Sequence, residues 1–246
     1  MDNKFILPCC SAILLGFIAG QLCVFILNSV PPKWLCDYGE KPGADLNGKR
    51  FFAKKQGLAS GAVLAAAFTL FYLNYHNQPL IMFFYCLAAL ALVMSSVSDL
   101  KYKIIPDQCI IFLAVCGALY YIHGIASSQQ QFDKTGPFVG ALCGGGLWLL
   151  LGFAGKIIYK EESIGFGDVK LFAAAGFLLG FPCVLAAFFL TIVTAGIVFS
   201  AMLLLKKTDG KSYLPMAPYI CASCIIVLAL KERICTFITW YLSLIT

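Results

Sequence analysis

Two aspartates lie at the ends of apolar segments in a strongly apolar sequence. Asp99 follows an uninterrupted apolar run in SDLKYKIIPD (98–107), and Asp168 precedes another in SIGFGDVKLF (163–172). An ionisable group beside hydrocarbon is costly, so its presence there suggests a function. Two carboxyls held close together cannot both ionise easily, and such a pair shares a proton. The ionised member can activate a water while the protonated member polarises a carbonyl, which is chemistry suited to peptide hydrolysis.

Each of these acidic residues also has a purely structural explanation. Asp168 could be the N-cap of a helix, with Gly165 and Gly167 forming the turn before it. Asp107 follows a proline, and its position in the first turn of a helix would complement the helix dipole. The catalytic interpretation of Asp99 and Asp168 is favoured because both are predicted at span ends on one side of a membrane. The two glycines would then permit unusual torsions and the close approach of a substrate strand.

The elements that must position these residues are membrane helices. Of the 246 residues, 61% are hydrophobic and 12% are charged, which excludes a disordered chain and exceeds the apolar content of a soluble domain. We expect an all-α, polytopic integral membrane helical bundle with about eight transmembrane helices, six or seven also being compatible, in a single domain over 1–246. The apolar segments are 5–27, 58–75, 80–97, 109–125, 137–157, 171–181, 183–205 and 215–230.

The basic residues are distributed unequally between the two sides of this bundle. Most of the 18 lysines and arginines lie in alternate loops, which carry Lys33, Lys41, Lys49, Arg50, Lys54, Lys55, Lys101, Lys103, Lys156, Lys160, Lys170, Lys206, Lys207 and Lys211. The positive-inside rule places these loops in the cytoplasm and both termini outside. The net charge of +6 therefore reflects topology, and we expect membrane lipid and no nucleic acid as a partner.

The cysteines do not form a metal-binding pattern. Most of the twelve lie in or beside apolar segments, where a thiol usually acts as a small hydrophobic group. Cys221 and Cys224 form a lone CxxC inside an apolar run, and the sequence has no HExxH motif. The polar segment 28–57 has the composition of a cytosolic loop and contains Cys36 as its one cysteine. We therefore expect no metal site.

The two acidic motifs resemble those of a known family. SDLKYKIIPD resembles the DxxxxxIP element of the type IV prepilin peptidases, and GFGDVK resembles their GxGDxK element, the signature of GxGD-class intramembrane aspartyl proteases. LPMAPYI (214–220) resembles a PxxP-type segment of the family, so the likeness extends over a catalytic core of about 80–225. It implies that Asp99 and Asp168 are the catalytic pair, supported by Gly165 and Gly167.

The resemblance also implies a substrate and a location. The substrate would be a type IV prepilin, or a pseudopilin of type II secretion, with a short basic leader that ends in glycine. Cleavage would follow that glycine on the cytosolic side of a bacterial inner (cytoplasmic) membrane, and the peptidase would require no cofactor. The sequence leaves the individual substrate and the oligomeric state open.

The amino-terminal third departs from the family pattern. Larger members carry two CxxC pairs in the first cytosolic loop, a zinc-knuckle signature, where residues 28–57 have only Cys36. Val24 stands where an asparagine is typical. Zinc binding is therefore not expected. Methylation of the new N-terminus, which would use S-adenosylmethionine, remains open.

Two other functions are compatible with parts of the sequence. A rhomboid-type serine protease would need a GxSG serine, but LASG around Ser60 lacks the first glycine. The histidines available to it, His76 and His123, are predicted near outer turns, about a membrane thickness from Ser60. A proton- or cation-coupled transporter could use paired carboxylates. The absence of an internal repeat and the interfacial placement of both aspartates argue against it.

Overall fold

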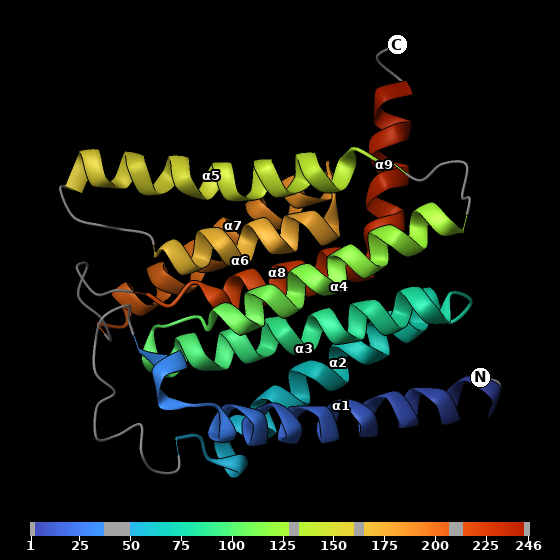
Figure 1. Cartoon of the computed structure of the whole chain (residues 1–246), viewed down its shortest axis with the longest axis horizontal. Helices are drawn as coiled ribbons and strands as arrows, with labels where there is room; N and C mark the ends of the chain where they lie inside the picture. The colour runs from blue at the N-terminus through green and yellow to red at the C-terminus, as the bar shows by residue number, and fades with distance from the viewer. Residues whose placement is uncertain (1–2, 37–49, 128–132, 160–164, 207–213, 244–246) are drawn as a thin grey trace. The chain divides into compact units, whose positions relative to one another are not determined.

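A computed structural model describes residues 3–36, 50–127, 133–159, 165–206 and 214–243 (Figure 1). The described residues form helices and short connections and contain no strand, which confirms the predicted all-α bundle. They divide into two compact units, residues 1–116 and 117–246, and each unit is described by itself. The interpretation of 1–246 as one integral membrane domain stays a prediction.

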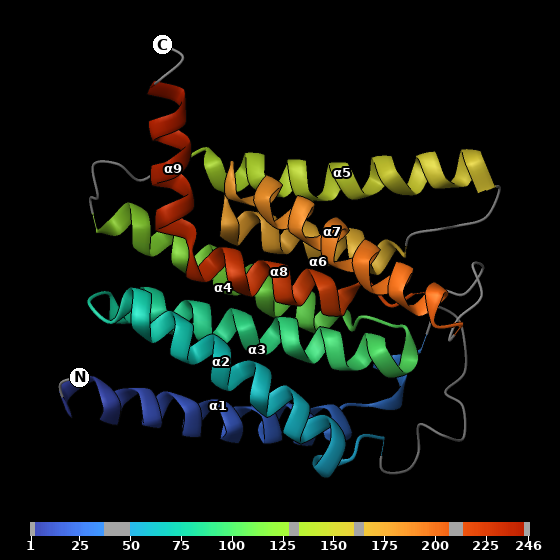
Figure 2. The same cartoon turned by 180° about the vertical axis from the view of Figure 1, so that it is seen from behind.

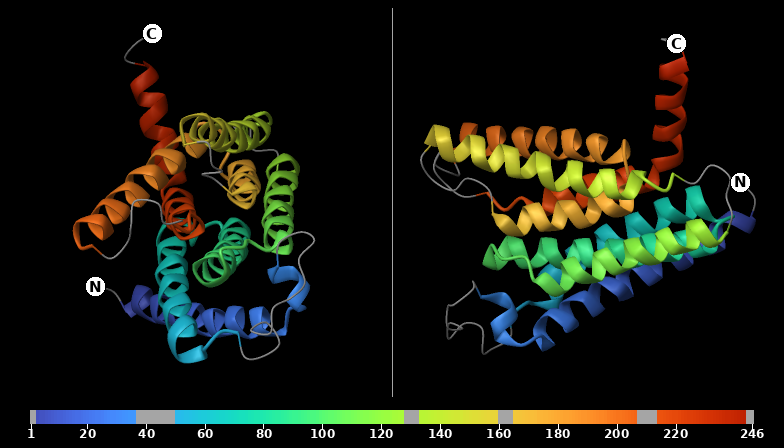
Figure 3. Two further views of the ribbon diagram at one scale, coloured as in Figure 1. Left: turned by 90° about the vertical axis from the view of Figure 1, so that its left-hand side faces the viewer. Right: turned by 45° about the horizontal axis from the view of Figure 1, so that its top comes forward.

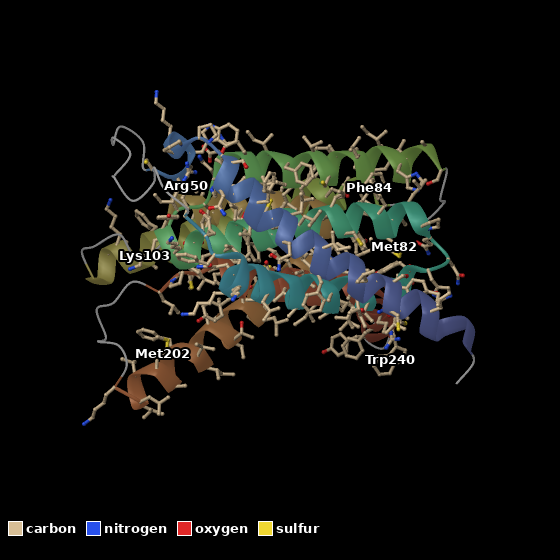
Figure 4. All side chains as sticks on the ribbon, turned by 90° about the horizontal axis from the view of Figure 1, so that it is seen from below. Arg50, Met82, Phe84, Lys103, Met202 and Trp240 are labelled. Carbon is tan, nitrogen blue, oxygen red and sulfur yellow. The ribbon has the colours of Figure 1, made fainter. Side chains whose placement is uncertain are left out.

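Unit 1 contains the first three long helices. α1 (Asn3–Ser29) leads into the short 3-10 turn η1 (Pro32–Leu35), and the π-helical turn η3 (Ala53–Gly57) leads into α2 (Leu58–Tyr75). α3 (Pro79–Tyr102) carries the first candidate aspartate, and α4 (Asp107–Ala126) begins in this unit. Figure 4 shows Arg50 and Lys103 together at one end of the unit, opposite Met82 and Phe84.

Unit 2 contains the remainder of α4 and five further helices. α5 (Gly136–Tyr159) is followed by the short α6 (Phe166–Leu179), which carries the second candidate aspartate. α7 (Cys183–Leu204), α8 (Ala217–Ala229) and α9 (Lys231–Ser243) complete the unit. α9 was not predicted. It follows α8 directly and runs across the direction of α5, α7 and α8 (Figures 2 and 3).

All eight predicted apolar segments form helices. Of the helices in the described part of the chain, six are long and apolar enough to cross a membrane. These are Leu7–Ser29, Lys54–Tyr75, Pro79–Tyr102, Asp107–Ala126, Gly136–Ile157 and Cys183–Leu204. At 1.5 Å per residue, α6 and α8 are only about 21 and 20 Å long, against about 30 Å of hydrocarbon. The structure thus supports the lower end of the predicted range and a multi-pass membrane protein.

Small residues let two pairs of helices pack backbone against backbone. In unit 1, a Cβ built on Gly20 would lie 2.3 Å from the Cα of Gly61, so α1 and α2 tolerate no side chain there. In unit 2, a Cβ on Gly140 of α5 would lie 2.3 Å from the carbonyl oxygen of Gly176 of α6, and the reverse distance is the same. Gly140 and Gly144 form a GxxxG motif, which permits this close approach in membranes. α6 is therefore fixed to α5 by its backbone.

Candidate active site

Asp99 lies in the last turn of α3 and is 2% exposed. The helix ends because Lys103 adopts a left-handed conformation (φ 56°), and its backbone N–H donates to the carbonyl of Asp99 at 2.9 Å. The hydroxyl of Ser98 donates to the carbonyl of Ile104 at 2.7 Å and fixes the turn that follows. These bonds hold Asp99 at the end of an apolar helix, where the sequence predicted it, and its carboxyl is more deeply buried than an interfacial position requires.

A side-chain clamp holds the described ends of the 28–57 loop together. The amide oxygen of Asn28 accepts from the backbone N–H groups of Arg50 (3.0 Å) and Phe51 (2.9 Å). Its amide nitrogen donates to the carbonyl of Phe51 at 3.0 Å. The Arg50 guanidinium donates to the carbonyl of Val30. We call Asn28, Arg50 and Phe51 the Asn28 clamp; residues 37–49, including Lys41 and Lys49, lie outside the described part of the loop.

The clamp is joined to the helix end that carries Asp99. The ammonium of Lys101 donates to the carbonyl of Arg50 and lies over the rings of Phe51 (5.3 Å) and Tyr102 (5.1 Å). The rings of Phe51 and Tyr102 pack edge to face with centroids 5.5 Å apart. Sequence analysis used Lys101 only as a marker of topology. Its contacts connect the loop to α3 within two residues of Asp99.

Replacing Asn28 by alanine should loosen this end of unit 1. The change removes three hydrogen bonds and leaves part-buried backbone N–H groups without their acceptor, at an expected cost of about 2 kcal/mol in the free energy of unfolding. Thermal unfolding in detergent and limited proteolysis between residues 33 and 57 measure the effect. Ser29→Ala is the matched control, because Ser29 bonds only to the carbonyl of Phe25 in its own helix. Equal melting temperatures for the two variants would contradict the role of the clamp.

Asp168 lies in the first turn of α6 and is also 2% exposed. The N-cap of this helix is Gly165 (φ −69°, ψ 139°), whose carbonyl accepts from the backbone N–H of Asp168 at 3.1 Å. The alternative in which Asp168 itself is the N-cap is therefore wrong, because the N-cap lies three residues earlier. Gly165 has ordinary extended torsions and Gly167 lies within the helix, so neither supports the expectation of unusual backbone conformations. Their role in admitting a substrate strand stays a prediction.

The face of α6 that carries Asp168 is held in an aromatic core. Phe172, one turn further along the same face, packs with Trp148 of α5 (centroids 5.8 Å) and Phe188 of α7 (6.2 Å). Trp148 and Phe172 are fully buried. Together with the contact between Gly140 and Gly176, these rings fix the rotation of α6 about its axis. Asp168 is thus positioned by three helices of unit 2.

Two further sequence predictions can be placed within unit 1. Asp107 is the first residue of α4, as its explanation through the helix dipole requires. Ser60 lies near the start of α2, where its hydroxyl donates to backbone carbonyls, including that of Gln56 at 2.8 Å. His76 follows the other end of α2, about 24 Å away along the helix. Ser60 and His76 cannot form a catalytic pair.

The amino-terminal loop does not fit a zinc knuckle. The thiol of Cys36, the one cysteine of residues 28–57, donates to the carbonyl of Pro32 at 3.3 Å. A structural zinc site needs four ligands, most often cysteine and histidine. No cluster of three or more His, Cys, Asp or Glu side chains suited to a metal occurs in the part of the chain that the structure describes. The Asn28 clamp joins the described ends of this loop through hydrogen bonds between protein groups.

A chelator should therefore leave the protein unchanged. In a protein stabilised by structural zinc, metal removal withdraws folding free energy, whereas the Asn28 clamp is made of hydrogen bonds between protein groups and residues 28–57 have one cysteine. We expect EDTA to alter neither the melting temperature in detergent nor the rate of any activity that the protein shows. A lowered melting temperature that added zinc restores would contradict this.

Comparison with known proteins gives a consistent result. Residues 86–200, which include both aspartates and both glycines, match the type IV leader peptidase family. The chain is 26% identical over 180 residues to the prepilin leader peptidase/N-methyltransferase of Bacillus subtilis (strain 168), covering 73% of this chain and 66% of that protein. The protein of the same name from Legionella pneumophila is 28% identical over 178 residues, covering 70% and 58%.

The corresponding protein from Aeromonas salmonicida (strain A449) is 29% identical over 154 residues, covering 63% of this chain and 50% of that protein. The chain thus spans half to two thirds of the length of these three relatives. No solved structure matches it.

Proposed function

We propose that the chain, whose residues 86–200 match the type IV leader peptidase family, is a membrane-embedded aspartic endopeptidase that removes the leader from type IV prepilins or pseudopilins. The observation that carries the proposal is the burial of Asp99 and Asp168, each 2% exposed and each in the end turn of an apolar helix. Carboxyls are almost never fully buried without a partner or a function. The proposal pairs them as the catalytic dyad.

The two helix ends suit different roles in hydrolysis. Asp168 lies at an amino-terminal end, where the partial positive charge of the helix stabilises a carboxylate. Asp99 lies at a carboxyl-terminal end, where the partial negative charge favours the neutral acid. In our proposal Asp168 takes a proton from the attacking water, while Asp99 donates a hydrogen bond to the oxygen of the scissile carbonyl. The proton held by Asp168 then passes to the departing amine as the C–N bond breaks.

The proposed substrate is a prepilin whose short basic leader ends in glycine and precedes a hydrophobic helix. Gly165 and Gly167 would leave room for its backbone beside Asp168. The lysine distribution supports cleavage on the cytosolic side of a bacterial inner membrane. Of the basic residues that support this orientation, Lys41, Lys49, Lys160, Lys207 and Lys211 lie outside the described residues.

The test is cleavage of a defined substrate by the purified protein. Full-length protein in detergent is incubated with candidate type IV prepilins, and the new amino terminus of the product is sequenced. We expect one cut, directly after the last glycine of the leader, and none in a prepilin whose glycine is replaced by a bulky residue. If flux of protons or cations in proteoliposomes is found without any proteolysis, the proposal fails and the transporter is supported.

Methylation of the new amino terminus is a separate activity. The relatives carry N-methyltransferase in their names, and S-adenosylmethionine is the donor that such an activity would require. Residues 30–36 and 50–57, the described part of the loop beyond the end of α1, provide no glycine-rich turn that would hold it. We therefore propose the peptidase without assigning the second activity to particular residues. Mass spectrometry of the mature product decides: a methyl group added by the purified protein would show that the zinc-knuckle cysteines are not needed for that step.

A further inference from the structure

Two cysteines from different helices of unit 2 have their sulfur atoms in contact. Cys183 is the first residue of α7, Cys235 lies in the second turn of α9, and their Sγ atoms are 3.5 Å apart. Neither is part of a disulfide in this structure. A disulfide brings its sulfurs to about 2.05 Å, so bond formation requires a movement of about 1.5 Å. Cys183 lies in the predicted apolar segment 183–205, where a thiol usually acts as a small hydrophobic group, and no role was predicted for Cys235.

The environment of this pair favours reaction at Cys235. Cys183 is 1% exposed, whereas Cys235 is partly accessible. The contact with Cys183, aided by the ammonium of Lys231 and opposed by burial and the Glu232 carboxylate, lowers the pKa of Cys235 from its ordinary value to about 6. Lys231 is held in place because it donates to the carbonyl of Leu178 at 3.2 Å and lies over the ring of Tyr120 at 4.8 Å. A thiolate is the form of cysteine that attacks disulfides.

The pair lies at the end of unit 2 away from Asp168. α6 runs from Asp168 towards the turn that precedes Cys183, and α7 returns towards the lysines after residue 204. Figure 4 shows Met202 of α7 and Trp240 of α9 at opposite ends of the unit. The excess of lysine beside Asp168 and after α7 places the cysteines on the extracytoplasmic side. Disulfides form and persist on that side of a bacterial membrane.

We propose that Cys183 and Cys235 form a disulfide that fastens α9 to the outer end of α7. The oxidant is a second disulfide, carried by an oxidoreductase or a small thiol compound. The Cys235 thiolate attacks one of its sulfurs, giving a mixed disulfide and releasing the other sulfur as a thiolate. Cys183 loses its proton and attacks the Sγ of Cys235, releasing the second thiolate. The protein loses two protons and two electrons, and the oxidant becomes two thiols.

The test maps the state of each cysteine in the full-length protein. Membrane proteins are denatured in the presence of N-ethylmaleimide, which blocks free thiols. The protein is then digested without reductant and analysed by mass spectrometry. We expect one cross-linked peptide pair containing Cys183 and Cys235, with Cys143 and Cys224 as maleimide adducts. Cys183→Ser and Cys235→Ser should each eliminate the pair, and the matched control Cys143→Ser should keep it. Maleimide adducts at both 183 and 235, or a link from either to another cysteine, overturn the proposal.

A second arm tests the order of attack. Reduced, purified protein is treated with oxidised glutathione, and the products are analysed in the same way. Cys183→Ser should accumulate a glutathione adduct on Cys235, because the second attack is missing, whereas buried Cys183 in Cys235→Ser should remain a thiol. Adducts on Cys183 but none on Cys235 would contradict the mechanism. Neither arm measures cleavage, so the outcome is independent of the proposed peptidase.

Discussion

Replacing either Asp99 or Asp168 by asparagine should reduce the rate of prepilin cleavage by about 10²- to 10⁴-fold, which is the contribution of a positioned acid or base. Asparagine keeps the size of the side chain but can neither take a proton from water nor share one with the other carboxyl. Both variants should insert and elute from a sizing column like the wild-type protein, because the change removes a buried ionisable group without creating a cavity. The measurement is the initial rate of product formation at matched protein concentration.

Asp107→Asn is the control for these variants. Asp107 begins α4 eight residues after Asp99 and is half-buried, and in the first turn its expected contribution is a favourable interaction with the helix dipole. Its loss should leave most of the activity and lower the free energy of unfolding by no more than about 1 kcal/mol, the contribution of a charge near a helix end. Substantial cleavage by either of the first two variants, or inactivity of Asp107→Asn in a folded protein, would mean that the wrong carboxyls have been chosen.

Adding a single methyl group at Gly140 should separate α5 from α6 and displace Asp168. The Cβ of Gly140→Ala would lie 2.3 Å from the carbonyl oxygen of Gly176, and 2.9 Å from the backbone of Gly180. These neighbours are backbone atoms that cannot rotate away, so the expected cost is at the upper end of the about 1–3 kcal/mol typical of overpacking. We expect a clear fall in melting temperature and the loss of most peptidase activity.

Gly146→Ala provides the matched comparison, because it lies in the same helix and a Cβ there meets no atom within 4 Å. Its melting temperature should equal or slightly exceed that of the wild-type protein, since alanine is the better helix former. Gly176→Ala should behave like Gly140→Ala, because the contact is reciprocal. If all three variants had the same melting temperature, the backbone contact would not be what holds α6.

Local patterns in the sequence were sufficient to predict the helices and the turns that carry the aspartates. Pro106 followed by Asp107 predicted the start of α4, and the glycines before Asp168 predicted the start of α6. These signals are local, since proline and glycine restrict or release the torsions of their own residues. The family resemblance pointed to the same two aspartates, and their catalytic role stays a prediction.

The contacts that join segments far apart in the sequence could not be predicted. Asn28 binds groups 22 and 23 residues away, and nothing distinguishes it in the sequence from another polar residue at a helix end. Cys183 and Cys235 are 52 residues apart, and cysteine connectivity cannot be deduced from one sequence. The last predicted apolar segment ended at residue 230, before the charged residues Lys231, Glu232 and Arg233. They begin a new helix, whose exposed Phe237, Trp240 and Tyr241 have helical spacing.

The shortness of α6 and α8 has a consequence for the thickness of the protein. Each helix falls about 10 Å short of the hydrocarbon layer, and about 10–12 Å is the diameter of one helix with its side chains. α9 follows α8 directly and runs across it, and Lys231 at its start binds the carbonyl of Leu178 near the end of α6 (Figure 2). One helix laid crosswise thus supplies the missing depth.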